Sequence, residues 1–246
     1  MKDAAVLLGF GTRALYVGPA LGLSAHRNAV AVLCAAISGK FGVARDPLDL
    51  RSPVVTCRTA LIPANSLHRL EIATEPMAFL YLDPQSADLT VLRAAMRHDY
   101  GRFLTGLRSE AAALAMFRRV ARGETEPAIV RVELATVLGL PSQARKDPRI
   151  TGAVQRMRAS PDESHALVDL AAAAGLSPSR FLHLFKQTTG VPLRRYRIWN
   201  RMGVAIRRIA GGATLTEAAH AAGFASSAHF SAAFRAMFGM TPSRLA

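Results

Sequence analysis

The sequence LVDLAAAAGLSPSRFLHLFKQTTG, residues 167–190, is followed by a second version of itself, LTEAAHAAGFASSAHFSAAFRAMFG, residues 215–239. Gly175 of the first copy aligns with Gly223 of the second. After a one-residue insertion, two phenylalanines and a basic residue also align. An internal repeat of this length is typical of a duplicated supersecondary unit.

The positions of glycine, serine and proline in each copy predict two helices joined by a tight turn. An alanine-rich run ends at a glycine, which suits a helix C-terminus because glycine accepts positive φ. In the first copy Ser177 is placed to cap the next helix and Pro178 to begin it, whereas Ser226 or Ser227 serves as the cap in the second. This is the helix-turn-helix layout. Ordinary helical hairpins share it, but the repetition and the basic background favour DNA binding.

The second helix of each copy has one apolar and one polar face at helical spacing. The positions expected to be buried are Phe181, Leu184, Phe185 and Thr188 in the first copy, and Phe230, Ala233, Phe234 and Met237 in the second. The positions expected to face outward are Ser179, Leu182, His183 and Lys186, and Ala228, Ser231, Ala232 and Arg235. A helix anchored by phenylalanines in this way can lie in a major groove and offer side chains to base edges.

The paired pattern resembles the AraC/XylS transcription regulators, including the sequence FGMTPSR at residues 238–244. The resemblance covers roughly residues 147–246. It implies a bridging helix, fitted by residues 191–211, that places two recognition helices in successive major grooves. A helix of twenty residues spans ~30 Å, close to the ~34 Å of one turn of B-DNA. The expected inner face of this bridge is Tyr196, Met202, Ala205 and Ile209.

The same resemblance assigns DNA contacts to individual positions. The implied base-reading residues are Ser179, Leu182 and His183 in the first copy and Ser227, Ala228 and Ala232 in the second, with His229 nearby. The cations expected to contact phosphates are Arg180, Lys186, Arg194, Arg195, Arg235 and Arg244. Alanine can touch a thymine methyl group but makes no bidentate hydrogen bond. We therefore expect the first copy to read bases more stringently than the second.

The amino-acid composition is typical of a protein that binds a polyanion such as DNA. The chain of 246 residues has a net charge of +14, and residues 147–246 carry 13 Lys and Arg against 5 Asp and Glu. The two cysteines, Cys34 and Cys57, lie in apolar runs and are expected to be buried thiols in a reducing compartment. No apolar run is long enough to span a membrane and no signal peptide is evident, so a cytoplasmic location is expected.

Residues 1 to about 85 are expected to form a small β-barrel or jelly roll, because short apolar runs alternate with Gly, Pro, Asn and Asp. The expected strands are residues 14–17, 29–37, 41–44, 54–62, 68–73 and 77–82. Residues 60–68 resemble the second cupin motif, and regulators of the AraC/XylS type often carry an N-terminal cupin-like domain that binds an effector. His68 is the candidate effector contact. No metal site is expected, because His26 and His68 lack a third ligand.

From about residue 88 to about residue 140, apolar residues recur at the spacing of a helix. One helical face begins at Leu89 and Leu92 and is expected to continue through Leu104, Leu107 and beyond, with a break at Gly101. A further helix is expected over residues 129–138. These helices resemble the dimer-forming hairpin of the family, although they can also simply pack on the barrel.

The predicted organisation is therefore α+β: a sensor and dimerisation domain over 1–140, a linker over 141–147, and a DNA-binding domain over 148–246. The predicted function is a sequence-specific transcription regulator, not an enzyme and without a cofactor. Its expected partners are double-stranded DNA, a small-molecule effector, RNA polymerase and a second copy of the chain. A cupin-type enzyme with a DNA-binding tail and an architectural protein without an effector are the alternatives. The sequence leaves open the effector, the operator and the direction of regulation.

Overall fold

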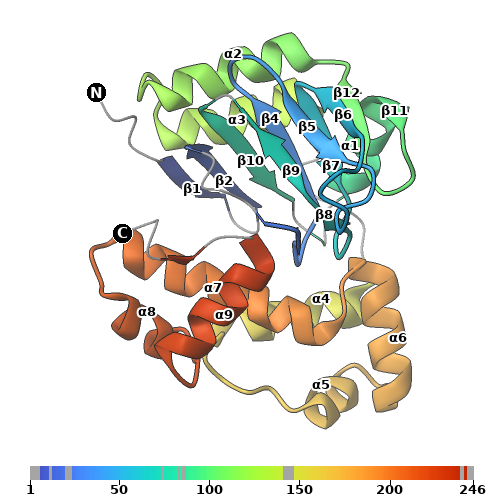
Figure 1. The fold of residues 1–246 in the computed structure, drawn as a ribbon. Helices are drawn as coiled ribbons and strands as arrows, with labels where there is room; N and C mark the ends of the chain where they lie inside the picture. Colours follow the sequence, from blue (N-terminus) through green and yellow to red (C-terminus); the bar gives the residue numbers. More distant parts are fainter. Residues whose placement is uncertain are drawn as a thin grey trace. The chain divides into compact units, whose positions relative to one another are not determined.

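The computed structural model describes residues 6–10, 13–19, 24–73, 75–82, 84, 87–140, 147–238 and 241–242. The chain divides into two compact units near residue 144 (Figure 1). Most of the predicted linker, residues 141–146, lies outside the described residues. Among the described helices, none combines the length and the apolar character needed to cross a membrane.

The N-terminal unit is built mainly from strands. The first ten are β1 (Val6–Phe10), β2 (Arg13–Gly18), β3 (His26–Arg27), β4 (Val32–Ala36), β5 (Phe41–Ala44), β6 (Val54–Cys57), β7 (Thr59–Ile62), β8 (Leu67–His68), β9 (Leu70–Ile72) and β10 (Met77–Tyr81). Helix α1 (Asp88–Ala95) follows, and then β11 (Met96–Asp99), β12 (Leu104–Leu107), α2 (Glu110–Ala121) and α3 (Pro127–Leu138). Strands lie within each predicted segment up to residue 82, but the predicted strand 54–62 is divided into β6 and β7 and the predicted strand 68–73 into β8 and β9, which belong to different sheets. Strands β1 and β3 were not predicted.

Seven strands form the main sheet in the order β1-β2-β10-β4-β7-β12-β11. A two-stranded sheet pairs β3 with β8, and a three-stranded sheet has the order β6-β5-β9. Successive side chains of a strand point to opposite faces. On β2, Leu15 and Val17 therefore join the apolar core that contains α2 and α3, while Tyr16 points to the other face. Helices α2 and α3 cover one face of the main sheet in Figure 1.

The expected α+β architecture is confirmed, with a β-rich N-terminal unit followed by a helical one. In the described part of the chain, however, the strands belong to three separate sheets and do not close into one barrel.

The prediction that strands end near residue 85 is wrong, as is the assignment of Leu104 and Leu107 to a helix. Both residues belong to β12, which pairs with β7 and β11 inside the main sheet. Gly101, with a positive φ of 78°, allows the chain to turn between β11 and β12. The apolar spacing of this segment fits a helix locally, but pairing with a distant strand decides its conformation.

An ion pair fixes the start of α1 to the main sheet. The Nε and Nη2 atoms of Arg13 each lie 2.7 Å from one carboxylate oxygen of Asp88. The Asp88 side chain is fully buried and that of Arg13 is 17% exposed. This bidentate geometry is the strong form of a charged hydrogen bond. It ties residues that are 75 positions apart in the sequence.

The C-terminal unit is helical among its described residues. Its helices are α4 (Pro148–Ala159), α5 (Leu167–Ala173), α6 (Pro178–Thr189), α7 (Leu193–Ala210), α8 (Leu215–Ala221) and α9 (Ser227–Phe238). The Asp147 side chain caps α4 by accepting from Arg149 N. A capping box between Thr214 and Glu217 begins α8. Both helix pairs of the predicted repeat, α5–α6 and α8–α9, are present.

Candidate nucleic-acid interface

Helix α6 is placed by its cap and its buried phenylalanines. Ser177 Oγ accepts from Arg180 N, and Pro178 occupies the first turn, as the sequence predicts. Phe181 and Phe185 are fully buried. The ring of Phe185 meets that of Tyr196 on α7 edge-on, with 5.4 Å between centroids. One face of α6 is thereby fixed against α7, and the opposite face is left free to contact other molecules.

The expected base-reading residues of the first copy lie on this outward face of α6. Ser179, Leu182 and His183 are all exposed, and Lys186 one turn later is exposed as well. Leu182 is 41% exposed, so its side chain is accessible to another molecule. A leucine in this position can contact a thymine methyl group, while serine and histidine can hydrogen-bond to base edges.

Helix α9 repeats the arrangement with different side chains. Ser226 Oγ accepts from His229 N at 3.1 Å, so Ser226 is the cap. Phe230 and Phe234 are buried, and Phe230 packs edge-on against Phe224 of the preceding turn. The outward positions are Ser227, which is half-buried, and Ala228, His229, Ala232 and Arg235, which are exposed. The outward face of α9 therefore carries fewer hydrogen-bonding groups than that of α6.

Helix α7 holds the two helix pairs apart. It has 18 residues, which corresponds to a length of about 27 Å. The predicted inner face, Tyr196, Met202, Ala205 and Ile209, is buried throughout. Because α6 ends just before α7 begins and α8 follows its end, the two pairs lie toward opposite ends of this helix (Figure 1).

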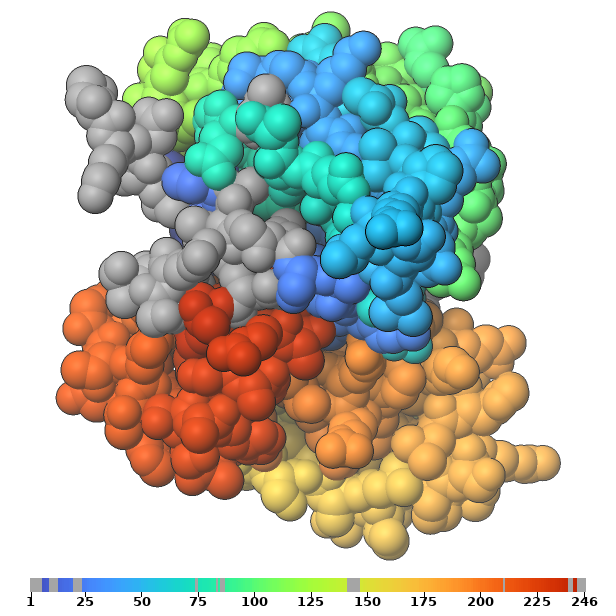
Figure 2. All heavy atoms as spheres, in the orientation of Figure 1, coloured from blue at the N-terminus to red at the C-terminus, as the bar shows by residue number. Residues whose placement is uncertain are grey.

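A loop between α4 and α5, residues 160–165, joins the two pairs in a way that the sequence did not reveal. An ideal Cβ on Gly223 would lie 2.9 Å from both Cα and O of Asp162, so the turn of the second pair lies directly against this loop. In Figure 2 the part of the chain around residue 160 is coloured yellow and the second helix pair orange-red. The relative placement of the two pairs therefore depends on a backbone contact as well as on α7.

Two arginines of α7 hold that loop. Arg201 Nε donates to Pro161 O at 3.2 Å, and Arg197 Nη2 donates to His165 O. His165 Nε2 in turn donates to Ser160 O at 2.7 Å. Burial, followed by the nearby charge of Arg201, lowers the pKa of Arg197. Neither arginine was singled out from the sequence, and both hold the protein's own backbone in place.

The expected phosphate contacts fall into three groups. Four are exposed on the helices of the C-terminal unit: Arg180, Lys186, Arg194 and Arg235. Arg195 is half-buried and already interacts within the protein. Arg244 lies outside the described residues. Arg207 and Arg208, which are exposed near the end of α7, were not singled out from the sequence.

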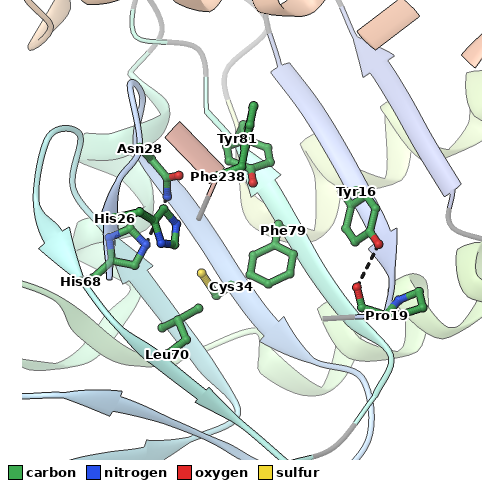
Figure 3. Close-up of a pocket in the computed structure, with 10 residues that line it drawn as sticks. All are labelled: Tyr16, Pro19, His26, Asn28, Cys34, His68, Leu70, Phe79, Tyr81 and Phe238. Atoms are coloured by element: carbon green, nitrogen blue, oxygen red, sulfur yellow. Dashed lines mark hydrogen bonds between the residues drawn. The ribbon is translucent and has the colours of Figure 1, made fainter. Parts of the chain in front are cut away.

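His68, the candidate effector contact, lies in the N-terminal unit and is buried. It is the cross-strand partner of His26 in the β3–β8 pair, with 4.2 Å between the ring centroids. Both rings line a small cavity (Figure 3). Among the described residues there is no group of three or more His, Cys, Asp or Glu side chains suited to a metal.

Comparison with known proteins identifies the C-terminal unit. A family described as "Helix-turn-helix domain" matches residues 170–246. A putative AraC-like transcription regulator of Streptomyces lividans is 36% identical over 98 residues, which cover 39% of this chain and 32% of that protein. The C-terminal domain is a helix-turn-helix domain of the AraC type. This AraC-type domain is also 35% identical over 80 residues to the probable transcriptional regulator LumQ of Photobacterium leiognathi, covering 32% of each chain. The matched segment spans about a third of these relatives.

Solved structures are similar in fold to this protein over both units, not only over the AraC-type domain. A crystal structure of ToxT from Vibrio cholerae has a TM-score of 0.57 at 14% identity, covering 94% of this chain and 95% of that one. A ToxT structure described as bound to an unsaturated fatty acid has a TM-score of 0.56 at 13% identity, covering 96% and 95%. At this identity the similarity shows the fold alone. The β-rich unit followed by the AraC-type domain is thus an arrangement that solved structures share.

Proposed function

We propose that this protein is a sequence-specific DNA-binding transcription regulator acting in the cytoplasm. The observation that carries the proposal is the pair of exposed helix faces on α6 and α9, each anchored from behind by buried phenylalanines. The two pairs lie toward opposite ends of α7, whose length approaches one turn of B-DNA. Exposed arginines and the lysine on these helices supply the phosphate contacts that such binding requires.

The two recognition helices have different roles in this proposal. Ser179 and His183 on α6 read base edges by hydrogen bonds, and Leu182 contacts a thymine methyl group. Ala228 and Ala232 on α9 make no such bonds, so α9 contributes methyl contacts, DNA shape readout and phosphate contacts. One half of the operator is then specified more stringently than the other.

The test is a selection of bound duplexes from a random pool, followed by affinity measurements at fixed salt. The double variant Ser179→Ala/His183→Ala is expected to lose base preference in one half-site. Ala232→Ser is expected to change preference less, and Gln155→Ala, an exposed change on α4, serves as the matched control. Equal loss of preference in both half-sites would contradict the asymmetry. Equal retention of random and selected duplexes by the unaltered protein would contradict the proposed function.

We further propose that the N-terminal unit pairs two copies of the chain. Helix α3 supports this, because it buries Val130, Leu134 and Leu138 on one side and still exposes apolar side chains on the other. Ile129 is 49% exposed and Val132 is 65% exposed. Exposed apolar groups in a row are typical of an interaction surface. Light scattering should report a dimer for the unaltered protein and for Gln155→Glu, and a monomer for Val132→Glu.

We also propose that a small-molecule effector regulates DNA binding through the N-terminal unit, with His68 as a contact. The fatty acid named for the ToxT structure supports a ligand role for this type of fold. An effector acts as a switch only if it binds the DNA-competent and incompetent arrangements differently. Contact with RNA polymerase belongs to the same proposal, and catalysis does not.

A further inference from the structure

A groove runs along one edge of the main sheet, between helix α1 and strand β11. Strand β11 is the last strand of this sheet and, among the described strands, pairs only with β12 (Figure 1). All four residues of β11, Met96–Asp99, line the groove, so it follows the whole strand, a length of ~13 Å. The volume of the groove is about 570 Å³, within the ~300–1,000 Å³ that is typical of binding clefts.

Part of the groove is lined by apolar side chains. The apolar residues are Leu89, Ala94, Met96 and Leu104. Met96 and Leu104 also belong to the apolar core of the N-terminal unit, and Leu89 packs against that core, so this surface is firmly held. An apolar side chain of a bound molecule would remove water from it, which is favourable.

The open edge of β11 offers backbone hydrogen-bonding groups to a partner. An edge strand pairs on one side only, so the N–H and C=O groups of alternate residues point away from the sheet. An extended peptide satisfies such groups by adding a further strand, and its side chains then occupy adjacent pockets. Six of the nine described residues that line the groove are exposed, so the groove suits a segment laid across the surface better than an enclosed small molecule.

The charges of the groove favour an acidic partner. Both carboxylate oxygens of Asp99 are already used, since Oδ2 lies 2.9 Å from Arg93 Nη2 and Oδ1 accepts from Gly101 N at 2.7 Å. Arg97 is exposed and has no ion-pair partner among the described residues. Residues 96–108 contain one acid, Asp99, and three exposed arginines, Arg97, Arg102 and Arg108. This excess of positive charge attracts carboxylates and repels basic segments.

Gly106 of β12 helps to hold Arg97 beside the groove. A Cβ on Gly106 would lie 3.4 Å from both Cβ and Cδ of Arg97, so the aliphatic part of the arginine packs closely on β12. A side chain whose stem is already held loses less conformational freedom when its charged end binds a partner.

We infer that the groove between α1 and β11 is a docking site for an extended, acidic segment of a partner protein, which adds to the main sheet as a strand beside β11. Its backbone pairs with the open edge, one of its carboxylates meets Arg97, and an apolar side chain lies against Leu89 and Met96. The inference goes beyond the proposed DNA binding, because it gives the N-terminal unit a protein partner of its own. A small anion and a second copy of the chain, the other occupants of such a groove, give different results in the same experiment.

The test titrates the full-length protein into a fluorescently labelled hexapeptide of alternating valine and glutamate and follows fluorescence anisotropy. A hexapeptide of alternating valine and lysine is expected to bind ~10-fold or more weakly, because attraction to Arg97 is replaced by repulsion. Arg97→Glu is expected to reverse the preference between the two peptides. Arg156→Glu, an exposed change on α4 with the same effect on net charge, should leave the preference unchanged.

Backbone pairing is tested with two N-methylated forms of the valine–glutamate peptide. Successive amides of a strand point to opposite edges, so methylating the valine amides blocks one edge and methylating the glutamate amides blocks the other. An added strand pairs through one edge only, so one form should lose binding and the other should retain it. In the unaltered protein, the unmethylated peptide should slow hydrogen exchange within residues 96–99.

The inference would be overturned if the valine–glutamate peptide did not bind, if the lysine peptide bound equally well, or if the two methylations had equal effects. Displacement of the peptide by N-acetylglutamate amide at the same carboxylate concentration would assign the groove to a small anion instead. A dimer that Arg97→Glu converts to a monomer in light scattering would assign it to a second copy of the chain.

The methylation and hydrogen-exchange measurements use the unaltered protein, so their results stand even if Arg97→Glu does not fold. Peptide binding is measured without DNA, and duplex affinity is measured separately. Failure to bind any DNA sequence would contradict the proposed function and leave the peptide result unaffected, so the two failures are distinguishable.

Discussion

The two turn glycines of the repeat offer a controlled measurement of how firmly the helix pairs are joined. Gly175 and Gly223 occupy equivalent turns, with φ of +64° and +74°. An alanine at either position is strained by roughly 1–2 kcal/mol, because L residues disfavour positive φ. Among the described residues, no atom lies within 4 Å of a Cβ built on Gly175, whereas a Cβ on Gly223 would lie 2.9 Å from the backbone of Asp162. The difference in stability between the Gly175→Ala and Gly223→Ala variants therefore measures the effect of the short distance between Gly223 and Asp162.

The loop that contains Asp162 has little freedom to move, since Arg197, Arg201 and His165 all donate hydrogen bonds to carbonyl groups in or beside it. Overpacking a fixed site typically costs ~1–3 kcal/mol. We therefore expect Gly223→Ala to destabilise the AraC-type domain by about 1–3 kcal/mol more than Gly175→Ala does. For a domain of this size, 1 kcal/mol corresponds to roughly 4–8 °C in Tm.

The assay is urea unfolding followed by tryptophan fluorescence. The chain has a single tryptophan, Trp199 on α7, so the signal reports the C-terminal unit. The slope of the free energy of unfolding against urea should stay constant, because a changed slope would indicate a different unfolding reaction. Gly223→Ala should also weaken binding to a selected duplex with both half-sites more than Gly175→Ala does. Equal losses of stability in the two variants would refute the reasoning.

Three further predictions concern charge. DNA affinity should fall by ~10³ to 10⁵ between about 50 and 200 mM salt if six to ten phosphates are contacted, and a flat salt dependence in filter binding would contradict the proposed interface. Asp88→Ala should destabilise the N-terminal unit by about 3–5 kcal/mol, because it leaves Arg13 without its buried partner, whereas Asp99→Ala at the exposed Arg93 pair should have little effect in the same circular-dichroism melt. Because the folded-state pKa of His68 is lowered to about 3, its contribution to stability is complete above its ordinary pKa of about 6.5 and is lost as the pH falls toward 3. The loss is at most ~1.4 kcal/mol per pH unit, and an unchanged pH slope in His68→Gln would rule this out.

Sequence predicted the AraC-type domain almost completely. The caps at Asp147, Ser177 and Ser226 and the positive φ of Gly175 and Gly223 all depend on residues within a few positions of each other. Helix periodicity has the same short range, so the phenylalanine faces of α6 and α9 and the inner face of α7 followed from spacing. Leu184, Thr188 and Ala233, which were expected to be buried, are only partly buried, and Ser231, expected to face outward, is only partly exposed. The resemblance to the AraC/XylS regulators added candidate DNA-contact roles to the exposed positions.

The N-terminal unit was predicted less well, because sheets depend on distant partners. Leu104 and Leu107 have apolar spacing that fits a helix, yet β12 pairs with β7, more than forty residues earlier in the chain. The cavity is a similar case, since His26 and His68 are neighbours only through the pairing of β3 with β8.

Sequence alone determined that two capped helix pairs exist, where each begins and ends, and which side of each recognition helix faces outward, because those properties are set by neighbours along the chain. Tertiary structure alone decided which arginines hold the 160–165 loop rather than remain exposed, how closely Gly223 approaches Asp162, and which polar atoms surround the cavity. Those properties arise from contacts between segments far apart in sequence, and no pattern within a single segment encodes them.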